Sequence, residues 1–337
     1  MRKGPSKLGD CPNFRSTKMG LSPSALLRSI AGLRKFGTFA GFLAIVVALS
    51  LLCPKFLTAA NLANVVRQSS IHGIMAVGMT LVILTAGIDL SVGSVLALAG
   101  VIGAGLEHRD WPLAAVLAAT LAVGGLAGLV NGLVVTKGRV TPFVVTLGTM
   151  SIARGLAHLL TGAQPISGFR PAFHFLGAGE ILAVPVPILL FLASVAAAAV
   201  LLERTRLGRY LYAIGGNLQA ARLSGIPVDR CTTAAYVLCG TAAAAGAIIL
   251  TARLNAAESI AGTGYELDVI ASVVIGGTSL SGGRGGVWGT LLGALLIGTI
   301  NNGMNLLGIS AYFQLVVKGA IIVVAAFLDR LQAGGRG

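Results

Sequence analysis

Polar residues interrupt this apolar chain at few points, and these are the first candidates for chemistry. The stretch LTAGIDLSVGSVLALAG (84–100) carries Asp89 and Ser91 among glycines inside an apolar run. Asp89 with Ser91 can cap the following helix and satisfy backbone N–H groups that lipid cannot satisfy. The alternative is a gate or a solute contact at a broken helix. Both interpretations stay open, and both residues are candidates for a translocation path or gate.

Two further sets of polar side chains recur at helical spacing. Arg154 and His158 share a helix face near the outer end of an expected span, where they can contact a solute or a docked partner. Asn301 and Asn305 also share a face, with Asn302 beside them. Such amides hydrogen-bond between helices, and they can also line a hydrophilic path. Arg154, Asn302 and Asn305 therefore join the candidate path residues, with helix packing as the alternative.

Sequence patterns of the common enzymes and metal sites are missing. The chain contains no GxxxxGK[ST], HExxH or GxSxG, and its four cysteines form no CxxC. The sequence therefore predicts no enzyme, no metal site and no cofactor bound by this chain.

Ion coupling is also disfavoured, because an ion-coupled transporter places ionisable groups inside its spans. The candidates are Asp89, Arg154, His158 and Lys318, and three of them can lie near span ends, where a long side chain reaches the interface. An energy source on a partner protein is favoured instead.

Composition assigns the chain to the membrane proteins. Of its 337 residues 55% are hydrophobic and 11% charged, whereas a soluble domain has about a quarter of its residues charged. Apolar runs of ~18–25 residues, long enough to cross a bilayer, recur along it. We expect an all-α polytopic transmembrane protein with about ten spans, at 36–53, 64–86, 91–106, 113–135, 141–160, 186–202, 231–252, 268–283, 287–308 and 312–328.

The distribution of charge predicts the orientation of these spans. Most of the 25 Lys and Arg residues fall in 1–35, in 203–230 and near the C-terminus, whereas the expected outer loops mix few basic residues with acids from Glu107 to Asp268. This is the positive-inside pattern, so both termini are expected to be cytoplasmic and the net charge of +14 needs no nucleic-acid partner. We expect a basic, disordered N-terminal tail (1–35), a permease domain (36–330) and a C-terminal tail (331–337).

The segment 203–230 contains a short helix with signals at both of its ends. In IGGNLQAARLSGIPVDR, Asn217 suits the N-cap of a helix over 218–223, Gly225 suits the left-handed residue after it, and Pro227 prevents continuation. Gly215 and Gly216 permit a sharp turn into this helix. So short a helix is unstable alone in water, so it must pack on a cytoplasmic partner or on the chain's own helix ends.

Several motifs in order resemble the membrane permease of ribose-type ABC importers. They are GIDLSVGSVLALAG, TPFVVTLGTMSIARGLAHLLTG, LGRYLYAIGGNLQAARLSGIPVDR and GGTSLSGGRGGVWGTLLGALLIGTINNG with the stretch up to Arg330, and they cover about 40–330. The resemblance implies that the 203–230 segment meets the ATPase. The implied coupling residues are Arg209, Gly215, Gly216, Asn217, Ala220, Ala221, Leu223, Ser224 and Gly225.

The same resemblance implies the partners and the mechanism. We expect a second permease copy or paralogue, a cytoplasmic ABC ATPase that holds ATP and Mg, and an extracytoplasmic solute-binding protein that docks on the outer loops 161–186 and 253–268, all at the bacterial inner membrane. The solute is a sugar or sugar-like molecule that the sequence does not select further. The alternatives are an ion-coupled secondary transporter acting alone and a membrane scaffold subunit without transport.

Overall fold

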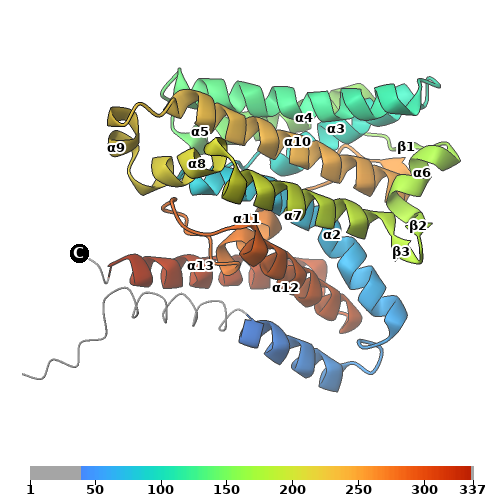
Figure 1. Ribbon diagram of the computed structural model, residues 1–337. Coiled ribbons are helices and arrows are strands. Elements are labelled where there is room, and N and C mark those ends of the chain that lie inside the picture. The colour runs from blue at the N-terminus through green and yellow to red at the C-terminus, as the bar shows by residue number, and fades with distance from the viewer. Residues whose placement is uncertain (1–38, 335–337) are drawn as a thin grey trace, which may run out of the picture.

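Helices make up most of the chain (Figure 1). The computed structural model describes residues 39–334, with side chains as far as Phe327. Its first helix is Phe39–Leu52. The other helices are α2 (Ala59–Leu84), α3 (Val92–Glu107), α4 (Leu113–Thr136), α5 (Pro142–Thr161), α6 (Pro171–Ala178), α7 (Val186–Arg204), α8 (Arg206–Gly216), α9 (Leu218–Leu223), α10 (Val228–Leu254), α11 (Tyr265–Ile275), α12 (Val287–Leu306) and α13 (Ala311–Gly334).

Short strands join loops at one end of this bundle. In the antiparallel pairs, β1 (Ile166–Ser167) lies beside β4 (Ala256–Ala257), and β2 (Glu180–Ile181) lies beside β3 (Val184–Pro185). In Figure 1 these strands and α6 lie at one end of the bundle, and α9 lies at the opposite end. The loops expected on the outer side thus share one end, away from the 203–230 segment.

The prediction of an all-α polytopic protein is confirmed. Each expected span corresponds to one helix, but the end of span 268–283 is wrong, because α11 stops at Ile275. The following stretch is rich in glycines, and several of them, including Gly277 and Gly283, adopt positive φ angles that end a helix. The expected tail 1–35 lies outside the described residues, and α13 runs to Gly334, into the segment 331–337.

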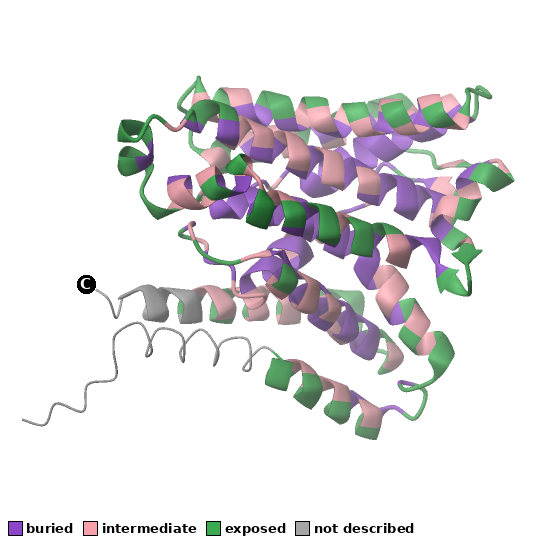
Figure 2. Ribbon diagram, viewed as in Figure 1, coloured by how far each residue is buried: buried purple, intermediate pink, exposed green. Residues whose placement is uncertain are grey.

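The helices divide into lipid-facing and enclosed ones. Four described helices, α4, α5, α7 and α10, are each long and apolar enough to cross a membrane, and three shorter apolar helices add to them. Exposed residues lie along α4 and α5, whereas α2 is buried throughout 69–84 (Figure 2). Because α2 is surrounded by protein there, its sequence can carry polar residues that a lipid-facing helix cannot.

Small residues allow the central helices to approach one another closely. Gly124 of α4 lies against Gly240 of α10 so tightly that a Cβ atom on either would meet the other's carbonyl oxygen. Such contacts, rather than large interlocking side chains, are typical of helix packing in membranes.

Candidate functional site

The chain between α7 and α10 forms two short helices whose ends are fixed by hydrogen bonds. The Thr205 hydroxyl accepts from the backbone N–H of Gly208 at the start of α8 (3.2 Å), and Asn217 Oδ1 accepts from the N–H of Ala220 at the start of α9 (2.9 Å). Gly225 follows α9 with a φ angle of 77°. The predicted N-cap, helix bounds and left-handed glycine of this segment are therefore confirmed.

Helix α9 presents most of its surface to the outside of the bundle. Among its residues Ala221 is buried, whereas Leu218 is 46% exposed and Leu223 90% exposed. The neighbouring α8 buries Leu211 and Ile214 and leaves Arg209 exposed. Because α8 anchors the segment, α9 is held in place with its leucines free to contact another chain.

The end of α8 lies in a tight junction with two distant segments. A Cβ atom on Gly215 would meet the carbonyl oxygen of Leu84, at the end of α2, and the backbone N–H of Gly283. Gly283 in turn donates from its N–H to the Leu84 carbonyl (3.0 Å). We call Leu84, Gly215, Gly216, Gly282 and Gly283 the glycine junction. The expected sharp turn at 215–216 is wrong, since both residues belong to α8, and Gly215 is small because other backbones approach it.

Side chains reinforce this junction from the start of α12. The Tyr212 hydroxyl donates to the carbonyl of Gly285 (2.9 Å), and Trp288 Nε1 donates to Glu203 Oε1 (3.1 Å). Burial raises the pKa of Tyr212, and the nearby Glu203 carboxylate raises it further, so the hydroxyl keeps its proton and its role as donor. The segment α8–α9 is thus tied both to α2 and to the loop between α11 and α12.

Hollows beside α9 give a partner protein something to fit. One cavity of about 320 Å³ lies between α9, α10 and the turns after α2 and α4, and its lining includes Gly87, Arg139, Leu218 and Tyr236. Another of about 470 Å³ shares Arg139 and adds Arg230. Arginines outnumber acids in both linings, where Asp229 pairs with Arg222 (3.7 Å) and Arg139 forms no ion pair with a described residue, so acidic side chains of a partner are favoured.

The candidate path residues Asp89 and Ser91 lie in a buried hydrogen-bonded cluster. Asp89 Oδ1 accepts from the backbone N–H of Ser91 (2.9 Å) and from its hydroxyl (2.5 Å). Asn131 Nδ2 donates to the Ser91 hydroxyl (3.0 Å), and the Thr149 hydroxyl donates to Asn131 Oδ1 (2.6 Å). The cluster ties the start of α3 to α4 and α5. Of the expected capping, only the bond from the Ser91 N–H to Asp89 is present, and the Ser91 side chain accepts from no backbone N–H of α3. Sequence reasoning missed Asn131 and Thr149, which lie far from residue 89 in the chain.

Arg154, another candidate, holds the loop that precedes α11. Its Nη1 donates to the carbonyls of Ser259 (2.6 Å) and Ala261 (2.7 Å). The same loop presses Gly262 against Gly93, near the start of α3. Arg154 therefore fixes a backbone segment between helices, and His158, on the same face, is half-buried.

The amides of α12 bind neighbouring helices. Asn302 exchanges two hydrogen bonds with Asn61 of α2 (2.9 and 3.0 Å), and Asn305 Oδ1 accepts from Gln314 of α13 (2.8 Å). Asn301 donates to Asp268 Oδ2 (3.3 Å). Asp268, expected in an outer loop, is instead buried on α11, because apolar residues follow it and the helix starts three residues before it.

Ion pairs and strand pairing hold the end of the bundle opposite α9. Arg170, which precedes α6, donates through Nε and Nη2 to both carboxylate oxygens of Glu107 (2.6 Å each), and β1 pairs with β4. The two loops 161–186 and 253–268 consequently form one connected surface.

Comparisons with known proteins agree with the motifs. A family described as "Branched-chain amino acid transport system / permease component" matches residues 61–326. The "Ribose import permease protein" of Escherichia coli (strain K12) is 48% identical over 291 residues, which cover 85% of this chain and 91% of that protein. The same-named protein of Bacillus subtilis (strain 168) is 47% identical over 302 residues, covering 88% and 93%.

A more distant relative is the "Galactose/methyl galactoside import permease protein" of Escherichia coli (strain K12), which is 37% identical over 319 residues, covering 89% and 95%. No solved structure gives a significant match. The chain therefore belongs to this family of permease components and, with its apolar helices, is a multi-pass membrane protein of the ribose-type import permeases.

Proposed function

We propose that this chain is the permease subunit of an ATP-driven importer that carries a sugar across the bacterial inner membrane. One observation supports this most: the capped helix α9, with Leu223 90% exposed, is joined through the glycine junction to α2 and to the loop before α12. A helix arranged in this way can receive a push from another protein and pass it to the helices of the bundle. The sugar specificity rests on the relatives, whose names include ribose, allose and galactose.

The two ends of the bundle suit two different partners. A cytoplasmic ATPase, which binds ATP and Mg, docks on α9 and the basic hollows beside it, and this chain binds no cofactor. A sugar-loaded binding protein docks on the surface formed by 161–186 and 253–268. The basic residues of the α9 end support the cytoplasmic orientation, and α13 ends on that side as well (Figure 1).

Two copies of the permease enclose the path in this proposal, and ATP-driven closure changes how their helices pack. Asp89, Ser91, Arg154, Asn302 and Asn305 tie together the elements that move. Asp89 and Ser91 are joined to α4 through Asn131, Arg154 to the loop before α11, Asn302 to α2 and Asn305 to α13. Their exchange of partners would accompany opening of the path.

The test reconstitutes the permease with its ATPase and binding protein in lipid vesicles and measures ATP-dependent uptake of D-ribose, D-allose and D-galactose. A variant with Gly225→Pro and Ala221→Glu disrupts the exit from α9 and its buried side. We expect this variant to insert and fold but to lose ATPase co-purification and uptake. Uptake driven by an ion gradient without ATPase would show a secondary transporter, and absence of transport with all partners bound would show a scaffold.

A further inference from the structure

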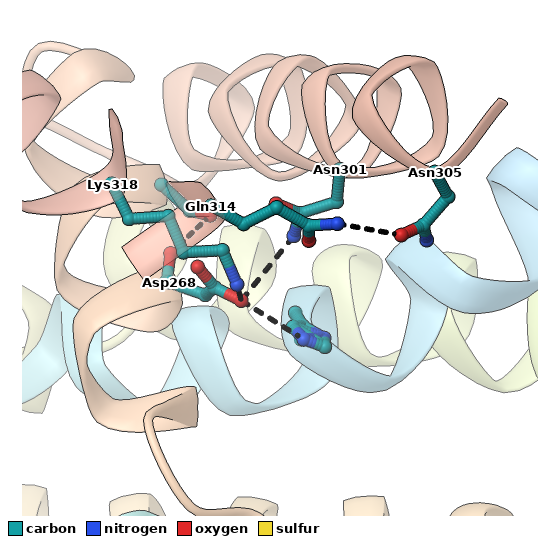
Figure 3. Close-up of polar contacts among 7 residues, drawn as sticks. Asp268, Asn301, Asn305, Gln314 and Lys318 are labelled. Carbon is teal, nitrogen blue, oxygen red and sulfur yellow. Dashed lines mark hydrogen bonds and ion pairs between the residues drawn. The ribbon is translucent and has the colours of Figure 1, made fainter. Parts of the chain in front are cut away.

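A buried charged cluster lies between four helices in the half of the bundle away from α9. Asp268 of α11 accepts through one oxygen, Oδ2, from Lys318 Nζ of α13 (2.8 Å) and from Asn301 Nδ2 of α12 (3.3 Å). His72 Nε2 of α2 lies 3.4 Å from the same oxygen. Figure 3 shows Lys318 and Asn301 directed toward Asp268. Ionisable groups inside a membrane bundle are expensive and mark functional sites by default.

The cluster leaves part of its hydrogen-bonding capacity unused. Asp268 Oδ1, Asn301 Oδ1 and His72 Nδ1 are buried without a partner among the described residues. Their residues are 1%, 6% and 6% exposed, so bulk water does not satisfy them. Leaving such atoms unpaired costs about 1–3 kcal/mol each, which makes a purely structural role for the cluster unfavourable.

These unused atoms define what the site can bind. Two of them are acceptors, and a carboxylate and an amide oxygen are suited to O–H donors. When the His72 imidazole is neutral, the positive charge of Lys318 balances the negative charge of Asp268, so the site favours a neutral ligand over an ion. The Tyr265 ring lies against His72 with ring centroids 4.2 Å apart and the planes tilted by 35°, and adds an aromatic wall.

Polar side chains lead from this cluster toward the end of α12. Asn305, one helical turn from Asn301, is exposed, and its hydrogen-bond partner Gln314 is half-buried. In Figure 3 both lie beside the cluster along the same side of α12. The Lys318 side chain is itself 18% exposed. The cluster is therefore connected to the surface of the single chain along α13.

We propose that Asp268, Asn301 and His72 form a transient binding site for hydroxyl groups of the transported solute, with Lys318 holding the carboxylate in place. The site rests on the proposed function, because it is part of a sugar path. The site binds neutral polyols. As the solute passes, its hydroxyl groups form hydrogen bonds with the atoms that are otherwise unpaired.

The test is a double-mutant cycle in which the Asn301 side chain and one hydroxyl group of the solute are removed separately and together. Uptake of D-ribose and of its 2-, 3- and 5-deoxy analogues is measured in vesicles with the complete complex, for the wild type and for Asn301→Ala. The binding protein's own preference cancels, because it is the same in both rows of the cycle. We expect at least one hydroxyl deletion to slow uptake between about threefold and tenfold more in the wild type than in the variant.

Thr80→Val is the matched control, because Thr80 forms a buried hydrogen bond to Thr290 between the same helices, α2 and α12 (2.7 Å). It should show no interaction with any hydroxyl. If Asn301→Ala does not fold, Asn301→Ser replaces it in the same cycle.

If the slowing of uptake by Asn301→Ala and the slowing by each hydroxyl deletion multiply independently, within twofold, the proposed site is overturned. Sugar import by the complex would remain intact in that case. A wild-type complex that carries none of these sugars, nor D-allose or D-galactose, would overturn the site and the proposed function together.

Discussion

The exposure of Leu223 on α9 gives a direct test of where the ATPase binds. The side chain is 90% exposed, so Leu223→Ala should leave the fold of the permease unchanged. If the ATPase covers it, the change removes three buried carbons at ~0.8 kcal/mol each, or about 2 kcal/mol. This weakens ATPase binding roughly thirtyfold.

The assay measures the affinity of the purified ATPase for the permease in lipid nanodiscs, with thermal unfolding of the permease as the check on folding. Leu182→Ala is the control, because Leu182 is 94% exposed in the turn between β2 and β3, at the opposite end of the bundle. The affinity of the ATPase for the Leu182→Ala permease should equal its affinity for the wild type. An affinity for Leu223→Ala within twofold of the wild type would refute the assignment of α9 as the docking helix.

Three more changes test the junction, the cap and the outer end. Gly283→Ala places a side chain at a φ angle of +69° and against the Gly216 N–H. We therefore expect sugar uptake per ATP to fall several-fold while the ATPase still co-purifies. The control Gly148→Ala, whose Cβ meets nothing within 4 Å, should change neither uptake nor co-purification. Asn217→Ala removes the N-cap of α9, worth about 1 kcal/mol, and should weaken ATPase binding roughly fivefold, with recovery in Asn217→Ser. Arg170→Ala leaves the buried Glu107 carboxylate without its guanidinium partner and should lower the midpoint of thermal unfolding of the permease, and an unchanged midpoint would contradict a stabilising contact between the two side chains.

Local signals carried most of the correct predictions. The apolar runs specified the helices because each span is continuous in sequence and its length is set by the bilayer. The ends of α9 were predictable because Asn217 and Gly225 act on their own backbone neighbours. Neither inference needs to know what lies beside the segment.

Contacts between distant segments were beyond the reach of these arguments. Asp268 begins an apolar run, so it was expected at a membrane surface, whereas its partners Lys318 and His72 come from α13 and α2. The sequence did show Lys318 inside an apolar run, and a search for an acid to pair with it would have included Asp268. The smallness of Gly215 was similarly assigned to a turn, because the neighbours that require it, Leu84 and Gly283, are far away in sequence.

The glycine junction has a consequence for building chimeric permeases. A chimera can receive α8 and α9 from a relative in order to match a foreign ATPase. The transferred helices then also place a new surface against Leu84 and the loop 276–286. Since backbone meets backbone there, one added methyl group on either side is enough to separate the parts. Compatible boundaries must therefore exchange 205–230 and 276–286 together, although most of α10, the loop with β4 and α11 separate them in the chain.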